Sequence, residues 1–365
     1  MTEFPQVMIN LDYLEQNVRT VMGRCADAGV SVAGVVKGAT GIAECIEVFA
    51  KGGATQIASS RLEQLETAKK LDTGLPLMLI RIPMMSEAAD AVRLADISLN
   101  SEITVLRELD RQAGIAGKRH GVILMADLGD LREGFWDRTE LIDAAVEVET
   151  GLQNLELKGV GTNLGCYGAI QPTTEKLDEL VSIAEQVEKA IGRNLEIISG
   201  GATSSYMRIL DGNLPEKINH LRIGEQILNA YDLEKYYGYD LSDMHSDVFT
   251  LRAEVVEVKT KPTHPVGEVG VDAFGRRLTY EDRGIRRRAI VAVGKADIGD
   301  SDNIFPADGG IEVLGGSSDH TILDVEDAER EIKPGDILDF AVNYGAVLYL
   351  TGSANVKIRF HKSVK

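Results

Sequence analysis

Lys37 is the residue whose type and position most directly suggest chemistry. It ends the apolar run 31–36 (Ser-Val-Ala-Gly-Val-Val) and is followed by 38–41 (Gly-Ala-Thr-Gly). Short apolar runs bounded by glycine are typical of buried parallel strands. A lysine at such a strand end places its amine at the mouth of the sheet, where α/β proteins hold catalytic groups. A partly desolvated amine can act as a nucleophile and form a Schiff base; the alternative is a lysine that extends into water.

Small and hydroxyl residues follow a later apolar run. The segment 199–205 reads Ser-Gly-Gly-Ala-Thr-Ser-Ser. Small residues let backbone N–H groups approach phosphate oxygens, and a helix N-terminus adds its dipole. We therefore expect Thr203 and Ser204 in a phosphate cradle. The alternative is that either residue caps a helix.

Two arginines also follow apolar runs. Arg132 could bind a carboxylate through its planar fork, or pair with Asp127 or Glu133. Arg222 could hold an anion or a ring nitrogen, or form a salt bridge to a neighbouring helix. Together with a Schiff-base lysine and a phosphate cradle, these arginines suggest pyridoxal phosphate. A barrel aldolase is the alternative, although aldolase lysines usually lie on a later strand.

The elements that must position these residues alternate between apolar runs and amphipathic stretches. Helical periodicity is clear at 61–71 and 174–191. Such alternation predicts βαβ units and a parallel sheet. Eight units predict an α/β (β/α)8 TIM-type barrel, with an open doubly wound sheet as the alternative. The eight expected strands are 32–37, 56–59, 77–81, 97–99, 121–127, 155–162, 195–199 and 221–224.

The pattern changes near residue 236. Residues beyond it alternate, are rich in β-branched types, and are divided by Gly, Pro and Asp, which predicts a C-terminal all-β domain. We expect a barrel over 1–235 and a β domain over 236–365, with a first strand at 7–11 that could join either. The expected strands of the second domain are 248–258, 288–293, 311–314, 321–325 and 341–350.

Composition narrows the class of protein. The net charge of −18 argues against nucleic acid and anionic membranes as partners. The three cysteines (Cys25, Cys45 and Cys166) have neither metal-site spacing nor a disulfide pattern, which favours a reducing compartment. No secretion signal or membrane-spanning run is evident. A cytoplasmic enzyme is the expectation.

The motifs resemble those of the alanine racemase-like family of fold type III pyridoxal-phosphate enzymes, and the match covers most of the chain. The matching segments are Val35-Val36-Lys37 (cofactor lysine), 127–134 (D-x-G-x-x-R-x-G), Ala202-Thr203-Ser204 (Ala-Asn-Ser), 222–225 (Arg-Pro-Gly-Ile) and 317–324 (Ser-Met-Asp-Gln-x-Met-Val-Asp). The resemblance implies a pyridoxal 5′-phosphate site formed by Lys37, Arg132, Asn163, Thr203, Ser204, Arg222, Gly224 and Glu225.

The chain departs from the family pattern at informative positions. The tyrosine expected just after Lys37 is missing, and Asn163 stands where a histidine usually stacks on the ring. Lys295 stands where the second catalytic base, a tyrosine, is expected. These departures, with the 221–225 (Leu-Arg-Ile-Gly-Glu) and 318–320 (Ser-Asp-His) segments, resemble the ornithine racemase branch.

The resemblance also implies an activity and an assembly. It implies an amino-acid racemase acting on ornithine or another basic amino acid, with Lys37 as one base and Arg132 binding the substrate carboxylate. Lys295 is the candidate for the second base, with His320 behind it. Ser318 and Asp319 would reach the substrate site of a neighbouring subunit, so we expect a homodimer with shared sites.

Other functions of the same fold type stay open. A D-amino-acid aldolase or dehydratase would need metal ligands in the β domain, where the histidines lack a close His-x-Cys pair, so no metal site is expected. A decarboxylase would want a reactive cysteine there, but none lies beyond Cys166. A non-enzymatic pyridoxal-phosphate carrier would not need the second domain.

Overall fold

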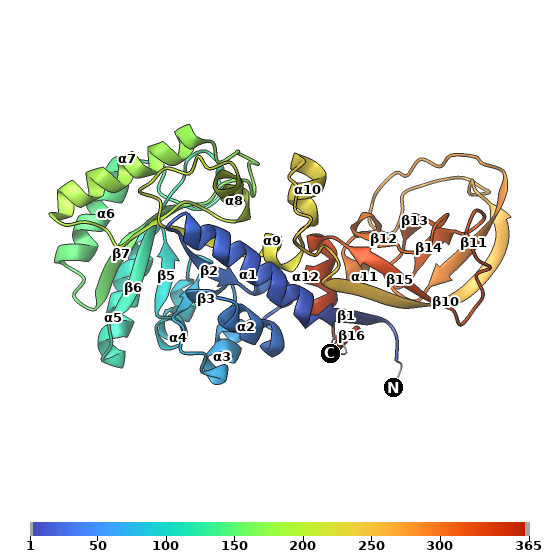
Figure 1. Ribbon diagram of the computed structural model, residues 1–365, viewed down its shortest axis with the longest axis horizontal. Helices are drawn as coiled ribbons and strands as arrows, with labels where there is room; N and C mark the ends of the chain where they lie inside the picture. The colour runs from blue at the N-terminus through green and yellow to red at the C-terminus, as the bar shows by residue number, and fades with distance from the viewer. Residues whose placement is uncertain (1–2, 362–365) are drawn as a thin grey trace. The chain divides into compact units, whose positions relative to one another are not determined.

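The computed structural model describes residues 3–361, which form two compact units (Figure 1). One unit spans Leu14–Met244. The other combines the described residues up to Tyr13 with those from His245 onward. The division near residue 244 lies beyond the expected boundary at 235/236, because helix α10 (Tyr231–Tyr237) continues across that boundary within the first unit.

The first unit contains the predicted barrel. Eight strands close in the order β2-β3-β4-β5-β6-β7-β8-β9. Adjacent strands are parallel throughout, including β2 with β9, so the open-sheet alternative is wrong. The strands are β2 (Ser31–Val35), β3 (Gln56–Ser59), β4 (Leu77–Leu79), β5 (Ile97–Asn100), β6 (His120–Ala126), β7 (Leu155–Thr162), β8 (Ile197–Ser199) and β9 (His220–Ile223).

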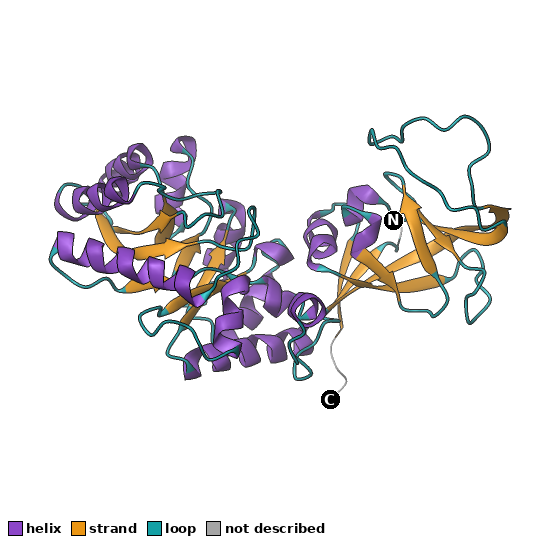
Figure 2. Ribbon diagram, turned by 90° about the horizontal axis from the view of Figure 1, so that it is seen from above, coloured by secondary structure: helices purple, strands orange, loops and turns teal. Residues whose placement is uncertain are grey.

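Helices connect the strands and surround the barrel (Figure 2). Their apolar faces are buried, as periodicity predicted for α3 and α7. They are α1 (Leu11–Asp27), α2 (Ala43–Lys51), α3 (Leu62–Leu71), α4 (Ala88–Leu94), α5 (Ile103–Ala116), α6 (Arg138–Thr150), α7 (Thr174–Ile191), α8 (Thr203–Leu210) and α9 (Glu225–Leu228), with short 3₁₀ turns η1 (Lys37–Ala39) and η2 (Met85–Glu87). Within residues 3–361, no helix is long and apolar enough to span a membrane.

Side chains from the strands fill the barrel interior, which makes it a packed core that supports the strand ends. One buried cluster draws on five of the strands, and it consists of Ala33, Val35, Ala58, Met78, Ile97, Leu99, Ile123 and Met125. Because this core is closed, the groups that follow each strand are held at one rim of the barrel.

A bulge in β7 shows how closely the strands pack. The register with β6 shifts so that Leu157 pairs with Val122 and Gly159 with Ile123, which leaves Lys158 without a ladder partner in β6. A Cβ at Gly159 would lie 1.8 Å from the carbonyl oxygen of Ile197 in β8. Only glycine allows this approach between the two backbones.

The second unit is an antiparallel β domain, as predicted. Its main path is β12-β15-β10-β11-β14-β13, and β1 pairs with β10 and β16. The first strand of the chain, expected to join either domain, therefore belongs to this sheet. The elements are β1 (Gln6–Asn10), β10 (Phe249–Pro262), β11 (Ile285–Val291), α11 (Lys295–Ile298), η3 (Ser301–Asn303), β12 (Ile304–Pro306), β13 (Glu312–Gly316), β14 (Thr321–Asp324), β15 (Ile337–Val342), α12 (Tyr344–Gly352) and β16 (Lys357–His361).

The expected strand at 341–350 is wrong for most of its length. Strand β15 ends at Val342, and α12 begins at Tyr344. The Asn343 side chain accepts a 3.1 Å hydrogen bond from the Ala346 N–H and thereby caps the helix. An apolar run of this length fits a buried strand or a buried helix, and here the cap decides between them.

Two glycine substitutions test the packing of the barrel. Gly159→Ala should lower the free energy of unfolding by about 3 kcal/mol or more, because its methyl group would collide with the β8 backbone. Gly23→Ala, within α1 and with no atom near the added methyl group, should raise it by about 0.5–1 kcal/mol. Denaturant unfolding of both variants measures the difference, and equal stabilities would contradict the close approach at Gly159.

Candidate active site

Lys37 lies at the rim formed by the strand ends, as the sequence predicts. The strand β2 ends at Val35, two residues before the expected end, and Lys37 is the first residue of η1 after Val36. Thr40 in the left-handed region (φ 46°) ends that turn. Burial lowers the pKa of Lys37, and the positive charge of Arg132 lowers it further, against opposing effects of Cys166, Glu225 and Glu133. The amine is therefore easier to deprotonate than a surface lysine, as a nucleophile or base requires.

The loop after β6 is held by the side chain of Asp127. One of its carboxylate oxygens accepts hydrogen bonds from the Gly129 and Leu131 N–H groups, at 2.8 and 3.1 Å. Leu131 adopts φ 56°, which is uncommon for a residue with a side chain. Gly134 has φ 135°, and a Cβ there would lie 2.4 Å from the Asp127 nitrogen. The glycine of the D-x-G-x-x-R-x-G motif thus permits the loop conformation that presents Arg132.

Arg132 makes a bidentate ion pair with Glu133, through Nε and Nη2. This is one of the two ion pairs that the sequence allowed; the Asp127 carboxylate instead organises the loop. The Arg132 side chain is 40% exposed and the Glu133 side chain is 16% exposed. Arg132 is therefore at the rim, and its carboxylate-binding fork is filled by its own neighbour.

Asp130, to which sequence reasoning gave no role, joins two rim loops. Its carboxylate accepts hydrogen bonds from the Tyr167 and Ile170 N–H groups, at 3.0 and 3.3 Å. Both donors belong to the loop after β7. The sequence placed Asp130 inside the 127–134 motif, but this position did not identify the two N–H groups that it binds.

Arg222 is buried at the end of β9, with 4% of its surface exposed. Its Nη2 donates a 2.7 Å hydrogen bond to the Thr162 carbonyl, and its Nη1 donates to the Ser199 hydroxyl. Burial lowers the pKa of Arg222 to about 10, so the group stays charged at neutral pH. The alternative of a salt bridge to a neighbouring helix is not seen among the described residues, and neutral oxygens hold the guanidinium instead.

Ser199 extends this network to a buried histidine. Its hydroxyl lies 2.8 Å from His220 Nδ1. Burial and the charge of Arg222 lower the pKa of His220 to about 3, so the imidazole is neutral. Because Arg222 donates to the Ser199 oxygen, the hydroxyl proton can be donated to His220. The chain Thr162-Arg222-Ser199-His220 fixes the arginine, and sequence reasoning missed its last two members.

The expected phosphate cradle lies at the start of α8. Ala202 is the N-cap residue and no side chain caps the helix, so the alternative of a Thr203 or Ser204 cap is not what forms. The Ser204 hydroxyl donates a 2.7 Å hydrogen bond to the Leu164 carbonyl and would have to rotate to donate to a phosphate. The first N–H groups of any helix lack intrahelical acceptors, so those of α8 suit an anion.

Gly224 and Glu225 border the cradle from β9. A Cβ at Gly224 would lie 2.5 Å from the Val35 carbonyl oxygen, so glycine is required where α9 begins beside β2. The Gln226 N–H donates to the Thr203 hydroxyl at 3.4 Å, which links the two helix starts. Burial and a hydrogen bond with Asp232 raise the pKa of the Glu225 side chain.

The rim fits the chemical groups of pyridoxal phosphate. Lys37 supplies an amine for the aldehyde, and α8 supplies donors for the phosphate. Two of the five N–H donors of Arg222 bind the Ser199 hydroxyl and the Thr162 carbonyl, and a remaining donor can bind a ring nitrogen. Asn163 is 7% exposed, and its buried Nδ2 has no hydrogen-bond partner within residues 3–361. An unsatisfied buried donor at this rim suits an acceptor group of the cofactor.

The β domain brings together the other predicted residues. The Lys295 and Ala296 N–H groups donate to the Ser317 and Ser318 carbonyls at 2.9 and 3.0 Å. A Cβ at Gly294 would lie 2.4–2.5 Å from backbone atoms of 318–320. The start of α11 therefore packs directly on the Ser-Asp-His turn. Residues separated by more than twenty positions form one feature, as the resemblance implies.

The side chains of this feature differ in exposure. Lys295 is 9% exposed, and its Nζ forms a 3.1 Å ion pair with Asp300 Oδ2. The Ser318 hydroxyl donates to Asp319 at 2.6 Å, and both residues, like His320, are exposed. Burial alone would raise the pKa of Asp300, but hydrogen bonds from Lys295 and the Ser301 N–H and nearby positive charges hold it below its ordinary value.

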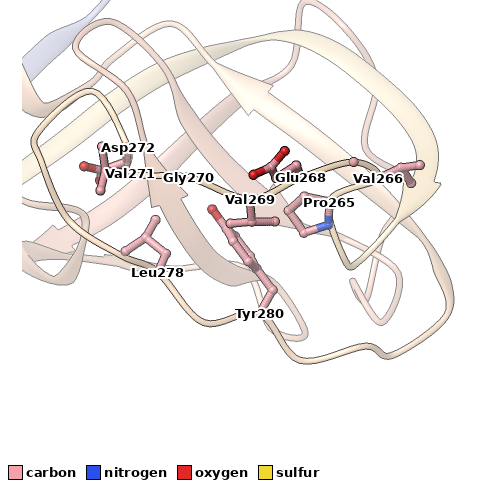
Figure 3. Close-up of a pocket in the computed structure, with 10 residues that line it drawn as sticks. Pro265, Val266, Glu268, Val269, Gly270, Val271, Asp272, Leu278 and Tyr280 are labelled. Carbon is pink, nitrogen blue, oxygen red and sulfur yellow. The ribbon is translucent and has the colours of Figure 1, made fainter.

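A long loop between β10 and β11 contributes to the surroundings of Lys295. The Lys295 Nζ lies 5.0 Å from the centre of the Phe274 ring. Arg276 shares Asp300 at 3.3 Å. The same loop lines a pocket from residues 265–272, Leu278 and Tyr280 (Figure 3), which includes none of the predicted site residues.

Comparison with known proteins gives a consistent result. Residues 9–231 match the family model described as "Alanine racemase, N-terminal domain". The chain is 42% identical over 345 residues to an ornithine racemase of Acetoanaerobium sticklandii, covering 94% of this chain and 96% of that protein. It is 38% identical over 361 residues to a lysine racemase of Thermotoga maritima, covering 99% of both.

The fold is also shared with solved structures. The structure of an alanine racemase from Streptomyces lavendulae superposes with a TM-score of 0.73 at 18% identity, covering 100% of this chain and 98% of that one. At this identity the likeness concerns the fold alone.

The charges around Lys37 predict how its reactivity depends on pH. In protein freed of cofactor, Arg132→Gln should raise the Lys37 pKa, since a nearby positive charge is removed, and Glu133→Gln should lower it. The pH at half-maximal labelling of Lys37 by an amine-reactive reagent, followed by peptide mass analysis, should shift in opposite directions, each by roughly one unit or less. Shifts of the same sign would contradict the described cluster of charges.

Proposed function

We propose that this chain, which belongs to the alanine racemase family, racemises a basic amino acid of the ornithine or lysine type. Membership rests on the family match over 9–231 and on relatives at 42% and 38% identity along nearly the whole chain. The geometry that carries the proposal is the partly desolvated Lys37 amine near the Arg132 guanidinium, whose charge also acts on the buried Arg222.

The enzyme uses pyridoxal phosphate, which when bound supplies an electron sink that acidifies the substrate Cα–H bond. The residues proposed to hold it are Lys37 at the aldehyde, Arg222 at the ring nitrogen, Asn163 beside the ring, and the starts of α8 and α9 at the phosphate. An arginine at the ring nitrogen would keep a positive charge beside that atom and disfavour its protonation. Arg222 would thereby weaken the electron sink and limit side reactions.

Racemisation requires a proton to leave one face of Cα and another to arrive on the opposite face. Lys37 Nζ is the proposed group on one face, and its lowered pKa increases the fraction of neutral amine, whose lone pair can take a proton. Lys295 Nζ is proposed for the other face, donated by a partner subunit. Its Nζ forms a 3.1 Å ion pair with Asp300. His320 is the next candidate because it lies on the turn that packs beside Lys295.

Arg132 is proposed to bind the substrate carboxylate. The fork geometry suits two parallel hydrogen bonds, and the Asp127 and Gly134 contacts preset the loop that carries it. Ser318 and Asp319 of a partner subunit are proposed to complete the substrate side. The active unit would then be a homodimer, and the three free cysteines support a cytoplasmic location.

Lys37→Ala tests the central assignment. The variant should lose the visible absorbance of the lysine-bound cofactor and nearly all racemisation of L-ornithine and L-lysine, measured by optical rotation. Lys51→Ala, which removes an exposed lysine paired with Glu47, is the matched control and should retain both. Retention of the absorbance band in Lys37→Ala would place the covalent attachment elsewhere. A wild-type protein that racemises neither amino acid would overturn the proposed function itself.

Mixing inactive variants tests the second group and the shared site. Lys37→Ala and Lys295→Ala chains should each be inactive alone. If Lys295 serves the partner's site, a mixed dimer has one site with both lysines and one with neither. Random exchange should then restore roughly a quarter of wild-type activity. Full activity of Lys295→Ala alone would move the role to His320, and no recovery after verified exchange would refute the shared site.

A further inference from the structure

Glu133 binds the Arg132 guanidinium, which is the group proposed to bind the substrate carboxylate. Its two carboxylate oxygens bind Nε and Nη2 of Arg132, the edge of the guanidinium that matches a substrate carboxylate. Both groups cannot use this edge at once. A substrate must therefore displace Glu133 before its own carboxylate can bind there.

The displaced carboxylate would stay at the rim but would lose its ion-pair partner. The negative charge of Glu133 acts on both Lys37 and Arg222, so its side chain lies within the cluster at the rim. Its side chain is only 16% exposed, and a carboxylate so placed is costly to leave without a partner. Binding an amino acid at Arg132 thus creates a need for a new positive group.

From this arrangement we infer that Glu133 is the residue that selects a cationic side chain. The inference rests on the proposed function and extends it. When the α-carboxylate takes the place of Glu133 on Arg132, Glu133 binds the distal ammonium of the substrate. The substrate and the ion pair exchange partners, so two charge-assisted pairs replace one. An amino acid with an uncharged side chain breaks the same ion pair but offers Glu133 no new positive partner.

The geometry allows one substrate to reach both residues. Arg132 and Glu133 are consecutive, so their Cα atoms are about 3.8 Å apart. Ornithine separates its two charged ends by a flexible chain of three methylene groups beyond Cα. The Asp127 hydrogen bonds and the left-handed Leu131 fix the loop just before this pair, so the two side chains can exchange partners without loop movement.

The decisive comparison uses L-ornithine and L-norvaline, which differ only in the distal amino group. The kcat/KM of the cofactor-loaded enzyme for each is measured by exchange of the α-hydrogen with deuterium. In Glu133→Gln the preference for ornithine over norvaline should fall by roughly tenfold or more. Valerate, which has a carboxylate and no amine, should inhibit this variant more strongly than wild type, because Arg132 is then free.

Two matched variants complete the experiment. Glu133→Asp keeps the charge and should keep most of the preference. Glu185→Gln removes a carboxylate from an exposed pair with Lys217 on the surface and should change neither quantity. A melting temperature for each variant verifies the fold.

The outcomes separate the two hypotheses. If the preference or the valerate inhibition is unchanged in Glu133→Gln, the role of Glu133 is refuted while the racemase function stands. If the wild-type enzyme exchanges the α-hydrogen of neither ornithine nor lysine, the proposed function fails first.

Discussion

Like charges gathered at one rim are the constraint on which the rest of the site depends. The positive charge of Arg132 acts on both Lys37 and Arg222. Burial makes each charge more expensive, and the protein meets that cost differently for each residue. Lys37 gives up affinity for its proton. Arg222 keeps its charge and is held by a carbonyl and a hydroxyl. Arg132 is neutralised by its neighbour Glu133.

The backbone makes this concentration of charge possible. The barrel core fixes the strand ends, and glycine is required where those ends meet. Gly224 lies against the Val35 carbonyl, and Gly134 lies against the Asp127 nitrogen. A side chain at either place would separate the loops that carry the cations. The carboxylates of Asp127 and Asp130 accept hydrogen bonds from loop N–H groups, and Glu133 is the carboxylate that forms the ion pair with Arg132.

The sequence predicts where each charged group lies, but it predicts the hydrogen-bond and ion-pair partners of that group less well. Lys37, Arg132 and Arg222 follow apolar runs, and strand ends of a parallel barrel meet at one rim by geometry alone. Which acceptors surround Arg222 depends on side-chain directions in β7 and β8, and no local pattern reveals them. The resemblance to a known family supplied roles for Lys295 and the 318–320 turn that spacing could not provide. The structure explains their association through the close approach at Gly294.

The wrong strand prediction in the β domain also concerns a choice that local composition leaves open. The run 341–350 has a composition suited to strand or helix, and one hydrogen bond from the Ala346 N–H to Asn343 settles the choice. The first strand of the chain could be recognised as a strand-like stretch at 7–11. Its pairing with β10 and β16 is a contact between residues more than two hundred positions apart. Local propensity determines that such a strand forms, while tertiary contacts determine where it joins.

The two lysines proposed for opposite faces of Cα show what these environments achieve. Burial and Arg132 act on Lys37 in the direction that removes its proton. Lys295 is also buried, but it faces the carboxylate of Asp300, whose own pKa is held below its ordinary value. The same side-chain type thus lies near a guanidinium group in one unit and beside a carboxylate in the other. Racemisation needs one group to take the proton and another to supply one, with the two roles reversed in the opposite direction. For Lys37 the surroundings act on the first role directly, because they favour the neutral amine.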